Sequence, residues 1–352
     1  MNLDDLDRFR ELDPQGMLAH IDGLPDQLEA AWAQGLTHEL PVWKGIRGVV
    51  VCGMGGSAIG ADLLAAYLAP QASVPIHVWR NYDLPAYVHG RDMLVVASSH
   101  SGNTEEVLSA FEMAQGRDVR LLAISTGGEL LRRAQSVGAP AWRFEHRGQP
   151  RAAVGFSFGL LLAALVRLGL AADQAAAVKA AAAAMRAQAA ILRAEVPVVS
   201  NPAKRMAGQW MGRWPTVIGA EFLAPVARRW RTQIGEIAKA VAQFEELPEA
   251  DHNLVAGVVY PEALFGQTMV VFLSGAALHP RNQLRLEVTR ETLMVEGFNT
   301  DVVKARGESP LSQQWTCLHF GDYSAYYLAM AYGIDPTPVA AIEGLKDRLR
   351  PG

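Results

Sequence analysis

The sequence has 352 residues, of which 50% are hydrophobic and 19% are charged, and its 36 acidic and 32 basic residues give a net charge of -4. This balance gives no electrostatic reason to expect binding to nucleic acid or to an anionic membrane. The length favours two domains, because single hydrophobic cores stop growing beyond about 250–300 residues. Cys52 and Cys317 are far apart in the chain and suit a reducing compartment better than a disulfide scaffold or a metal site.

The first segment of the chain is acidic, and it lacks the apolar stretch of a secretory signal. We therefore expect a cytoplasmic protein. Gly23–Gln27 opens an amphipathic helix that continues through Trp32. We assign this helix to an N-terminal helical arm formed by residues 1–40.

The next part of the chain alternates between strand and helix patterns. The first core strand is predicted at Gly48–Cys52, and it runs into a glycine-rich turn, Gly53–Gly60, and then into a helix that stops at Pro70. Further strands are predicted at 75–79, 94–97 and 119–126, with helical patterns between them. This alternation indicates a parallel sheet covered on both faces. We assign residues 41–172 to this first domain.

A hydroxyl-rich turn, Ser98–Glu106, directly follows the apolar run 93–97. A helix is predicted from Glu105 to Gln115, so the turn lies where backbone N–H groups point outward and favour an anion. Ser99, Ser101 and Thr104 add three hydroxyl groups, and the turn contains no Lys or Arg. The pattern favours a phosphate monoester held by neutral donors over a nucleotide triphosphate with its metal. The alternative is a helix N-cap with additional serines.

The glycine-rich turn permits two interpretations. Gly53-x-Gly55-x-x-Ala58 satisfies a loose form of the dinucleotide fingerprint, and Arg80 at the end of the second strand could accept a 2′-phosphate, as in an NADP enzyme. That interpretation leaves the second turn, Ser98–Glu106, unexplained. Two turns of this kind at the carboxyl ends of strands in one sheet favour a sugar phosphate.

Two helices are predicted in the middle of the chain. The uncharged stretch Ala152–Val166 is short for a membrane span and is expected to form a buried helix. The alanine-rich stretch Ala171–Ala190 predicts a long helix between the two halves. We assign residues 173–198 to this linking helix and residues 199–352 to a second domain with C-terminal helices.

In the second half, strand-like runs occur at 214–220, 254–260, 269–274 and 291–296, which predicts another α/β domain. A helix is predicted over 224–244. Helical spacing places Glu236 on a face with Arg229 and Gln233, and Glu236 is expected to lie near the protein surface or a cleft. Another face is expected to carry four apolar side chains, Trp230, Ile234, Ile237 and Val241.

Several motifs resemble those of one known family. They are the two turns Gly53–Gly60 and Ser99–Glu106, the helix Arg229–Lys239, Leu247–Asn253, and Gly321–Tyr323 with Asp335–Pro338. In this order along the chain they resemble the bifunctional phosphoglucose/phosphomannose isomerases of the sugar isomerase (SIS) superfamily. The resemblance implies an α/β fold of two doubly wound parallel-sheet SIS domains with flanking helices, a homodimer, and no metal or organic cofactor. It also implies an aldose–ketose isomerase that converts glucose 6-phosphate or mannose 6-phosphate into fructose 6-phosphate.

The resemblance also implies substrate-binding residues. Gly55, Gly56 and Ser57 would contact the sugar, and Ser99, Ser101 and Thr104 would hold the phosphate. Thr337 matches a small hydroxyl residue that leaves room for the mannose configuration at C2. Without the resemblance, Thr337 is equally well explained as a helix N-cap before Pro338.

The remaining residues that the resemblance implies are catalytic. Glu236 would shuttle a proton between C1 and C2 through a cis-enediol, and Arg151 would stabilise the enediolate. His252, supplied by the partner subunit, and Lys346 would assist ring opening. Taken singly, these residues could also be a solvated helix glutamate, a surface cation, a loop histidine and a charge in the last turn of a helix.

The chain also departs from the family pattern. Gly235 stands where an asparagine is expected before the glutamate, and Ile237 follows where a smaller polar residue is common. These departures concern substrate preference more than reaction class. A regulator that binds sugar phosphates through SIS domains is the alternative function, and the absence of a basic patch disfavours it.

Overall fold

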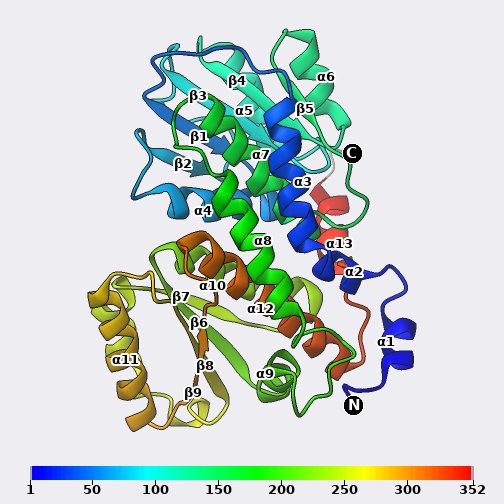
Figure 1. The fold of residues 1–352 in the computed structure, drawn as a ribbon, viewed down its shortest axis with the longest axis vertical. Coiled ribbons are helices and arrows are strands. Elements are labelled where there is room, and N and C mark those ends of the chain that lie inside the picture. The colour runs from blue at the N-terminus through cyan, green and yellow to red at the C-terminus, as the bar shows by residue number, and fades with distance from the viewer. Residues whose placement is uncertain (1, 350–352) are drawn as a thin grey trace.

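The computed structural model describes residues 2–349. Two parallel sheets lie one above the other along the long axis of the molecule, with helices around and between them (Figure 1). The fold class is therefore the predicted one, with two doubly wound α/β units.

The first sheet has the strand order β2-β1-β3-β4-β5, and every pair of neighbouring strands is parallel. Its strands are β1 (Gly48–Cys52), β2 (Ile76–Trp79), β3 (Met93–Ser98), β4 (Arg120–Ser125) and β5 (Ala141–Arg143). The first four were predicted from the sequence, and β5 was not. The strand order reverses between β1 and β3, and in such sheets ligands bind at the carboxyl ends of the strands at that point.

Alternate residues of the first sheet pack against different sets of helices. Val50 and Cys52 belong to a core cluster with α5 and α6, whereas Val49 and Val51 belong to a larger cluster with α3, α4 and α7. The helices of this half are α1 (Leu6–Leu12), α2 (Met17–Asp22), α3 (Leu24–Thr37), α4 (Gly55–Leu68), α5 (Glu105–Gln115), α6 (Gly128–Ser136), the 3₁₀ turn η1 (Pro150–Ala153) and α7 (Val154–Arg167).

The apolar helix predicted in the middle of the chain lies in the interior. The stretch Pro150–Arg167 is long and apolar enough to cross a membrane, but 72% of it is buried inside the structure. It packs against α3 and α4, and Phe158 and Leu161 are almost completely buried. This stretch is therefore a core helix.

The two halves are joined by helices α8 (Ala175–Ala189) and α12 (Pro310–Tyr332), and α9 (Pro202–Trp210) packs against α12. Helix α8 runs from one half to the other (Figure 1). Every residue of α12 from Leu311 to Ala331 is buried. The larger core cluster continues through these helices into the second half. The domain boundaries at residues 40, 172 and 198 stay a prediction.

The second sheet is also parallel, with the order β7-β6-β8-β9. Its strands are β6 (Trp214–Ala220), β7 (Gln243–Leu247), β8 (Thr268–Ser274) and β9 (Asn299–Lys304). The accompanying helices and 3₁₀ turns are η2 (Glu221–Leu223), α10 (Ala224–Ile237), η3 (Glu249–His252), η4 (Leu254–Gly257), η5 (Glu262–Leu264), α11 (Pro280–Val295) and α13 (Ala340–Leu349).

Two predicted strands of this half are wrong. The apolar run 254–260 begins as the 3₁₀ turn η4, because the Asn253 side chain accepts a hydrogen bond from the Leu254 N–H and initiates a turn. The run 291–296 belongs mostly to α11, whose buried residues Leu286, Thr289 and Leu293 recur at helical spacing. The strand β9 follows it and was missed.

The helix predicted over 224–244 is too long at its C-terminal end. α10 ends at Ile237, and Lys239 has a positive φ of 53°. Val241 is 65% exposed and so does not share the apolar face of the helix. The last residues of the predicted helix instead begin β7. Trp230 and Ile234 are buried as predicted.

Two glycines of this region are expected to respond oppositely to alanine. A Cβ on Gly321 of α12 would lie 2.0 Å from Nε1 of Trp230, so Gly321→Ala should lower the free energy of unfolding by about 3 kcal/mol or more. A Cβ on Gly235 would meet only the Ala240 carbonyl oxygen, at 4.0 Å, so Gly235→Ala should raise it by about 0.5–1 kcal/mol. Urea denaturation of both variants would measure these changes. A destabilising Gly235→Ala would contradict the open surroundings of this residue.

Candidate active site

The hydroxyl-rich turn lies between β3 and α5, beside the point where the strand order reverses. The hydroxyl groups of Ser99 and Thr104 are 2.8 Å apart, and the Ser99 Oγ accepts a hydrogen bond of 3.1 Å from the Gly102 N–H. Thr104 is the N-cap residue of α5, but its side chain makes no capping hydrogen bond. The hydroxyls of Ser99 and Thr104 therefore face each other instead of capping the helix, which favours a ligand cradle over an ordinary N-cap.

The turn after β4 holds this cradle in place. The carbonyl oxygen of His100 accepts hydrogen bonds from the Thr126 N–H and hydroxyl, at 3.1 and 2.7 Å. A Cβ on Gly102, which has a φ of +68°, would lie 1.9 Å from the Gly127 carbonyl oxygen. Only glycine fits there. The cradle carbonyls therefore point toward the β4 turn, which leaves the hydroxyls and the N-terminus of α5 for a ligand.

The glycine-rich turn packs directly against η1. A Cβ on Gly56 would lie 2.4 Å from the Pro150 carbonyl oxygen and 3.1 Å from the Arg151 backbone nitrogen. Gly55 has a positive φ of 52°. Ser57 is buried in the first turn of α4. The absence of a side chain on Gly56 therefore brings the start of α4 next to Arg151.

Arg151 joins three segments that are distant in the sequence. Its side chain is 3% exposed, and Nη1 lies 3.5 Å from a carboxylate oxygen of Glu236 at the end of α10. Nη2 donates to the carbonyl oxygens of Pro336 and Thr337, at 2.9 and 2.5 Å. Burial lowers the pKa of Arg151 and the Glu236 charge acts in the opposite direction, so the guanidinium stays charged. Three residues implied by the resemblance, Arg151, Glu236 and Thr337, thus meet at one place.

Two buried polar atoms at this place have no partner among the residues that the structure describes. They are Nε of Arg151 and Oγ1 of Thr337. Buried polar groups are nearly always hydrogen-bonded in folded proteins, so these two atoms mark a position where a ligand or water can bind. Thr337 does not cap a helix, because α13 begins only at Ala340.

Sequence reasoning missed the group that supports Arg151. Arg229 of α10 is buried and donates to both carboxylate oxygens of Asp322 on α12, at 3.1 and 2.6 Å. Gln233 donates to the same carboxylate at 3.0 Å, and Arg229 also donates to the Arg151 carbonyl oxygen at 3.1 Å. Asp322 is one of the motif residues, but only the fold shows its partners. The face of α10 that carries Arg229 and Gln233 is buried, and only Glu236 at its end is partly exposed.

Lys239 is a further missed residue. Its Nζ donates to the carbonyl oxygens of Glu236 and Pro336, at 2.6 and 3.2 Å, and so ties the end of α10 to the segment that carries Thr337. Desolvation and the neighbouring Arg151 charge lower the pKa of Lys239 to about 8, against the opposing charges of Asp335 and Glu236.

Arg80, the basic residue that the dinucleotide interpretation requires, is already paired with another side chain. Arg80, the candidate for a 2′-phosphate, pairs with Asp62 of α4, and Arg228 of α10 pairs with the same carboxylate at 3.1 Å. Arg80 therefore serves a contact between the two halves.

His252 and Lys346 lie elsewhere. His252 is exposed at the end of η3, and Lys346 is exposed on α13. Within residues 2–349, no hydrogen bond or ion pair joins either side chain to Arg151 or Glu236. A role for them in the same site would need a second subunit or a movement of α13.

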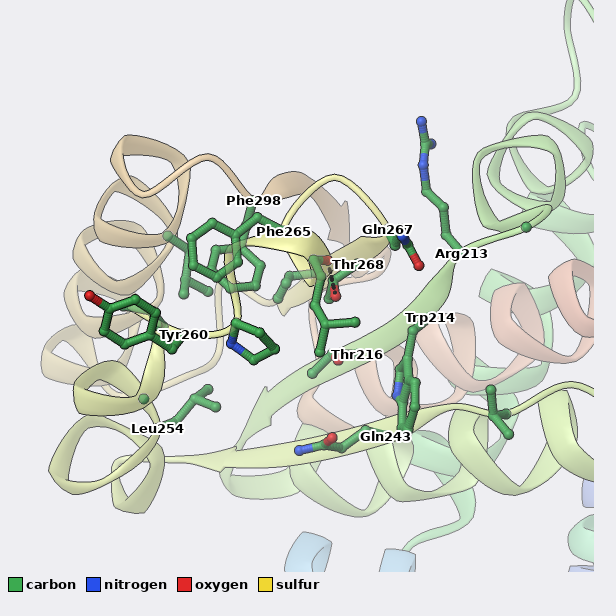
Figure 2. Close-up of a pocket in the computed structure, with 18 residues that line it drawn as sticks. Arg213, Trp214, Thr216, Gln243, Leu254, Tyr260, Phe265, Gln267, Thr268 and Phe298 are labelled. Carbon is green, nitrogen blue, oxygen red and sulfur yellow. Dashed lines mark hydrogen bonds between the residues drawn. The ribbon is translucent and has the colours of Figure 1, made fainter.

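A separate cavity lies on the second sheet, apart from Arg151 and Glu236. It has a volume of about 540 Å³ and is mainly apolar. Figure 2 shows it between Leu254 and Tyr260 at one end and Arg213 and Trp214 at the other. Phe265 and Phe298, with ring centroids 4.5 Å apart, form one wall. The cavity lacks the acid–base groups of the candidate site.

The buried pair Arg229–Asp322 gives a test of how the site is supported. Asp322→Asn leaves the charge of Arg229 uncompensated in the interior and should lower the free energy of unfolding by about 3–5 kcal/mol. Asp118→Asn breaks an exposed pair with Arg91 and should change it by less than about 1 kcal/mol. Urea denaturation would compare the two. An equal change in the free energy of unfolding for both variants would show that the buried pair stabilises the fold no more than the exposed pair does.

Comparison with known proteins identifies the family. The family model described as the bacterial phospho-glucose isomerase C-terminal SIS domain matches residues 199–349. A bifunctional phosphoglucose/phosphomannose isomerase of Caldicellulosiruptor bescii is 35% identical over 337 residues, which is 95% of this chain and 98% of that protein. One of Aquifex aeolicus is 33% identical over 331 residues, 94% of this chain and 97% of that protein.

A solved structure has the same fold. The glucose-6-phosphate isomerase like protein from Thermus thermophilus superposes with a TM-score of 0.64 at 19% identity, covering 96% of this chain and 98% of that one. The sequence relatives, which match nearly from end to end, carry the stronger conclusion. The chain belongs to the family of bifunctional phosphoglucose/phosphomannose isomerases.

Proposed function

We propose that this protein is an aldose–ketose isomerase that interconverts glucose 6-phosphate or mannose 6-phosphate with fructose 6-phosphate. The relatives that match nearly the whole chain bear the name of this activity. The observation that carries the proposal is the pair formed by the Glu236 carboxylate and the buried Arg151 guanidinium, which lies against the glycine-rich turn. No observation favours a sugar-phosphate-binding regulator over an enzyme.

In this proposal the phosphate binds to Ser99, Ser101 and Thr104 at the N-terminus of α5, where the helix dipole favours an anion. The sugar then extends past Gly55, Gly56 and Ser57 toward Arg151. In this proposal the phosphate and the reacting carbons lie at opposite ends of the bound substrate. The phosphate cradle holds the substrate, and the charged pair acts on it.

Glu236 is the proposed base. It removes the proton from C2 of the aldose and returns it to C1, with a cis-enediol as the intermediate, and Arg151 stabilises the negative charge that develops on the oxygen. The Nε–H of Arg151 has no hydrogen-bond partner among the described residues, and we propose that it donates to this oxygen. Thr337 is proposed to accommodate the mannose configuration at C2, and its orphaned hydroxyl would bind there.

Replacing the base tests this mechanism. Glu236→Gln keeps the shape of the side chain and can still accept from Arg151, but it cannot take a proton. We expect turnover to fall by at least about 10²–10⁴-fold, with little change in the affinity for fructose 6-phosphate. In D₂O the wild type should place deuterium at C2 of the glucose 6-phosphate that it forms from fructose 6-phosphate.

The matched control is Glu287→Gln, which alters an exposed glutamate of α11 and should leave turnover unchanged. If Glu236→Gln kept most of its activity and its deuterium incorporation, the base would have to be another residue. If Glu236→Gln also lost its preference for phosphorylated over free sugar, this would contradict the proposal that the base and the phosphate cradle act at separate ends of the substrate.

We further propose that the enzyme is a homodimer in which His252 serves the partner's site. α10 leads from the carboxyl end of β6 to the amino end of β7, so Glu236 lies about 18 Å along the helix from its start. His252 follows the carboxyl end of β7, at the other edge of the sheet. This topology separates the base from the histidine within one chain, as a site shared between two subunits requires.

The surface next to His252 supports this proposal. Val259, Tyr260 and Leu264 follow it in the chain and are 51%, 77% and 46% exposed. Tyr260 and Leu264 also line the apolar cavity of Figure 2. Large apolar side chains that cluster at the surface commonly mark a protein interface. We propose that a second copy of this chain covers these side chains. His252 of one subunit then enters the active site of the other subunit, where His252 and Lys346 assist ring opening.

A mixture of two inactive variants tests the shared site. Glu236→Gln and His252→Ala subunits that exchange should form heterodimers in which one site has both groups and the other has neither. Activity on closed-ring glucose 6-phosphate should therefore rise above that of either parent. If both groups came from one chain, every site would lack one group and mixing would restore nothing. Exchange is confirmed separately with differently tagged subunits.

We also propose a cytoplasmic location. Cys52 and Cys317 are both buried and unpaired, and such thiols suit a reducing compartment.

A further inference from the structure

Three histidine rings pack against one another directly behind the phosphate cradle, one pair edge to face and the other tilted, and we call this group the stack. His100, which lies between Ser99 and Ser101, has its Nε2 3.0 Å from Nδ1 of His146. The His146 ring also packs against His20 of α2, with 5.1 Å between their centroids. A Cβ on Gly148 would lie 2.7 Å from Nε2 of His20, so the approach of this loop depends on glycine. None of these rings takes part in the proposed proton transfer between C1 and C2.

The surroundings of the stack favour its neutral form near pH 7 in the ligand-free protein. Burial lowers the pKa of His100 and of His20, and burial together with the two neighbouring rings lowers the pKa of His146 to about 4. The carboxylate that acts on the stack is Asp13, which faces His20 and acts against its desolvation. The other rings packed on His146 and His100 belong to Phe144 and Phe156, which carry no charge.

The cradle itself has no positively charged residue. The turn Ser98–Glu106 contains neither Lys nor Arg, and it ends in two glutamates, Glu105 and Glu106. A phosphate dianion held there relies on hydroxyls and on the helix N-terminus. His100 is the titratable residue of this turn that can become a cation, and its neighbours in the chain are two of the proposed phosphate ligands.

We propose that the stack of His100, His146 and His20 supplies this missing charge, so that binding of a phosphate dianion in the cradle is coupled to uptake of one proton by the stack. The proposal rests on the proposed function, because it requires that the cradle binds phosphate. It adds a role for three residues outside the catalytic set and makes substrate affinity dependent on pH.

The geometry provides a path for this proton. In the neutral state the tautomer that leaves no buried N–H unpaired has Nδ1–H of His146 donating to Nε2 of His100. Nε2 of His146 is then a buried nitrogen with a free lone pair, in agreement with its lack of a partner among the described residues. A proton taken from solvent or buffer bonds to this nitrogen. The bridging proton then moves across the 3.0 Å hydrogen bond to His100.

The final state places one positive charge on His100, at the cradle, and leaves His146 neutral with its proton on Nε2. The charge-assisted hydrogen bond from Nε2 of His100 to Nδ1 of His146 stabilises this state. A dianion several ångströms away adds to this stabilisation. In a partly buried site it should raise the proton affinity of the stack by about tenfold.

The test compares phosphate binding by the wild type and by His100→Gln between pH 5.5 and 8. The ligand is glucitol 6-phosphate, which has no carbonyl group and cannot be isomerised. Because the titration of the ligand's own phosphate is common to both proteins, it cancels in the ratio of their affinities. We expect this ratio to rise about three- to tenfold between pH 8 and pH 5.5. Calorimetry in two buffers of different ionisation enthalpy at pH 6 should show greater proton uptake by the wild type.

Two further variants make the result specific. His146→Gln leaves the cradle sequence intact and should lose the same pH dependence, even if His100→Gln folds poorly. His89→Gln alters an exposed histidine outside the stack and should keep it. An affinity ratio that does not change with pH for either stack variant would overturn the proposal. Equal binding of glucitol and glucitol 6-phosphate would overturn the phosphate cradle itself, and the proposal with it.

Discussion

The ion pair between Arg229 and Asp322 is the contact on which the arrangement of the site depends. It joins α10 to α12 in the interior, and the same guanidinium donates to the backbone carbonyl of Arg151. A buried ion pair is stable only when its geometry is good and its remaining donors are satisfied. Gln233 and the Arg151 carbonyl meet that condition. The pair therefore determines where the end of α10 lies relative to η1, and so where Glu236 meets Arg151.

The long helix α12 makes this pair possible. Its residues are buried almost from end to end, and they contact α8, α9 and α10. Gly321, next to Asp322, leaves the space that the Trp230 ring fills. A wide aromatic ring and a charged pair therefore pack side by side on the same two helices. Trp230, Arg229 and Asp322 are all buried there.

The sequence predicted local structure best where each residue type favours a single backbone conformation. The hydroxyl-rich turn and the helix from Glu105 to Gln115 lie where they were predicted, because strand, turn and helix signals coincide there. The glycine-rich turn was predicted over Gly53–Gly60 and is shorter than that, because α4 already begins at Gly55. The predicted strand at 254–260 failed because an apolar run does not distinguish a buried strand from a turn that lies largely at the surface. β7 was missed because its edge position leaves a polar sequence, Gln243–Leu247, with little strand character.

Tertiary partners could not be predicted from the sequence in the same way. Nothing local to Asp322 indicates that it faces Arg229, 93 residues away. Lys239 lies at the end of a motif, yet its contact with Pro336 depends on how the C-terminal segment returns to α10. The three histidines behind the cradle are likewise distant from one another in the chain. Such groups meet only through packing, and the sequence pattern carries no signal for that.

The two ends of the proposed site differ in the charge of the groups that form them. The proposed phosphate end consists of hydroxyls and a helix N-terminus, and without a ligand it carries no full positive charge. The Thr126 N–H and hydroxyl of the β4 turn hold it through the His100 carbonyl oxygen. The reacting end contains full charges, Arg151 and Glu236, in a partly dry environment where each strengthens the other. In the proposed mechanism the charges of Arg151 and Glu236 act on the transition state, whereas the cradle, away from the reacting carbons, binds substrate and transition state equally. On the proposed function, affinity therefore comes mainly from the first sheet, and catalysis takes place where the second half brings α10 against it.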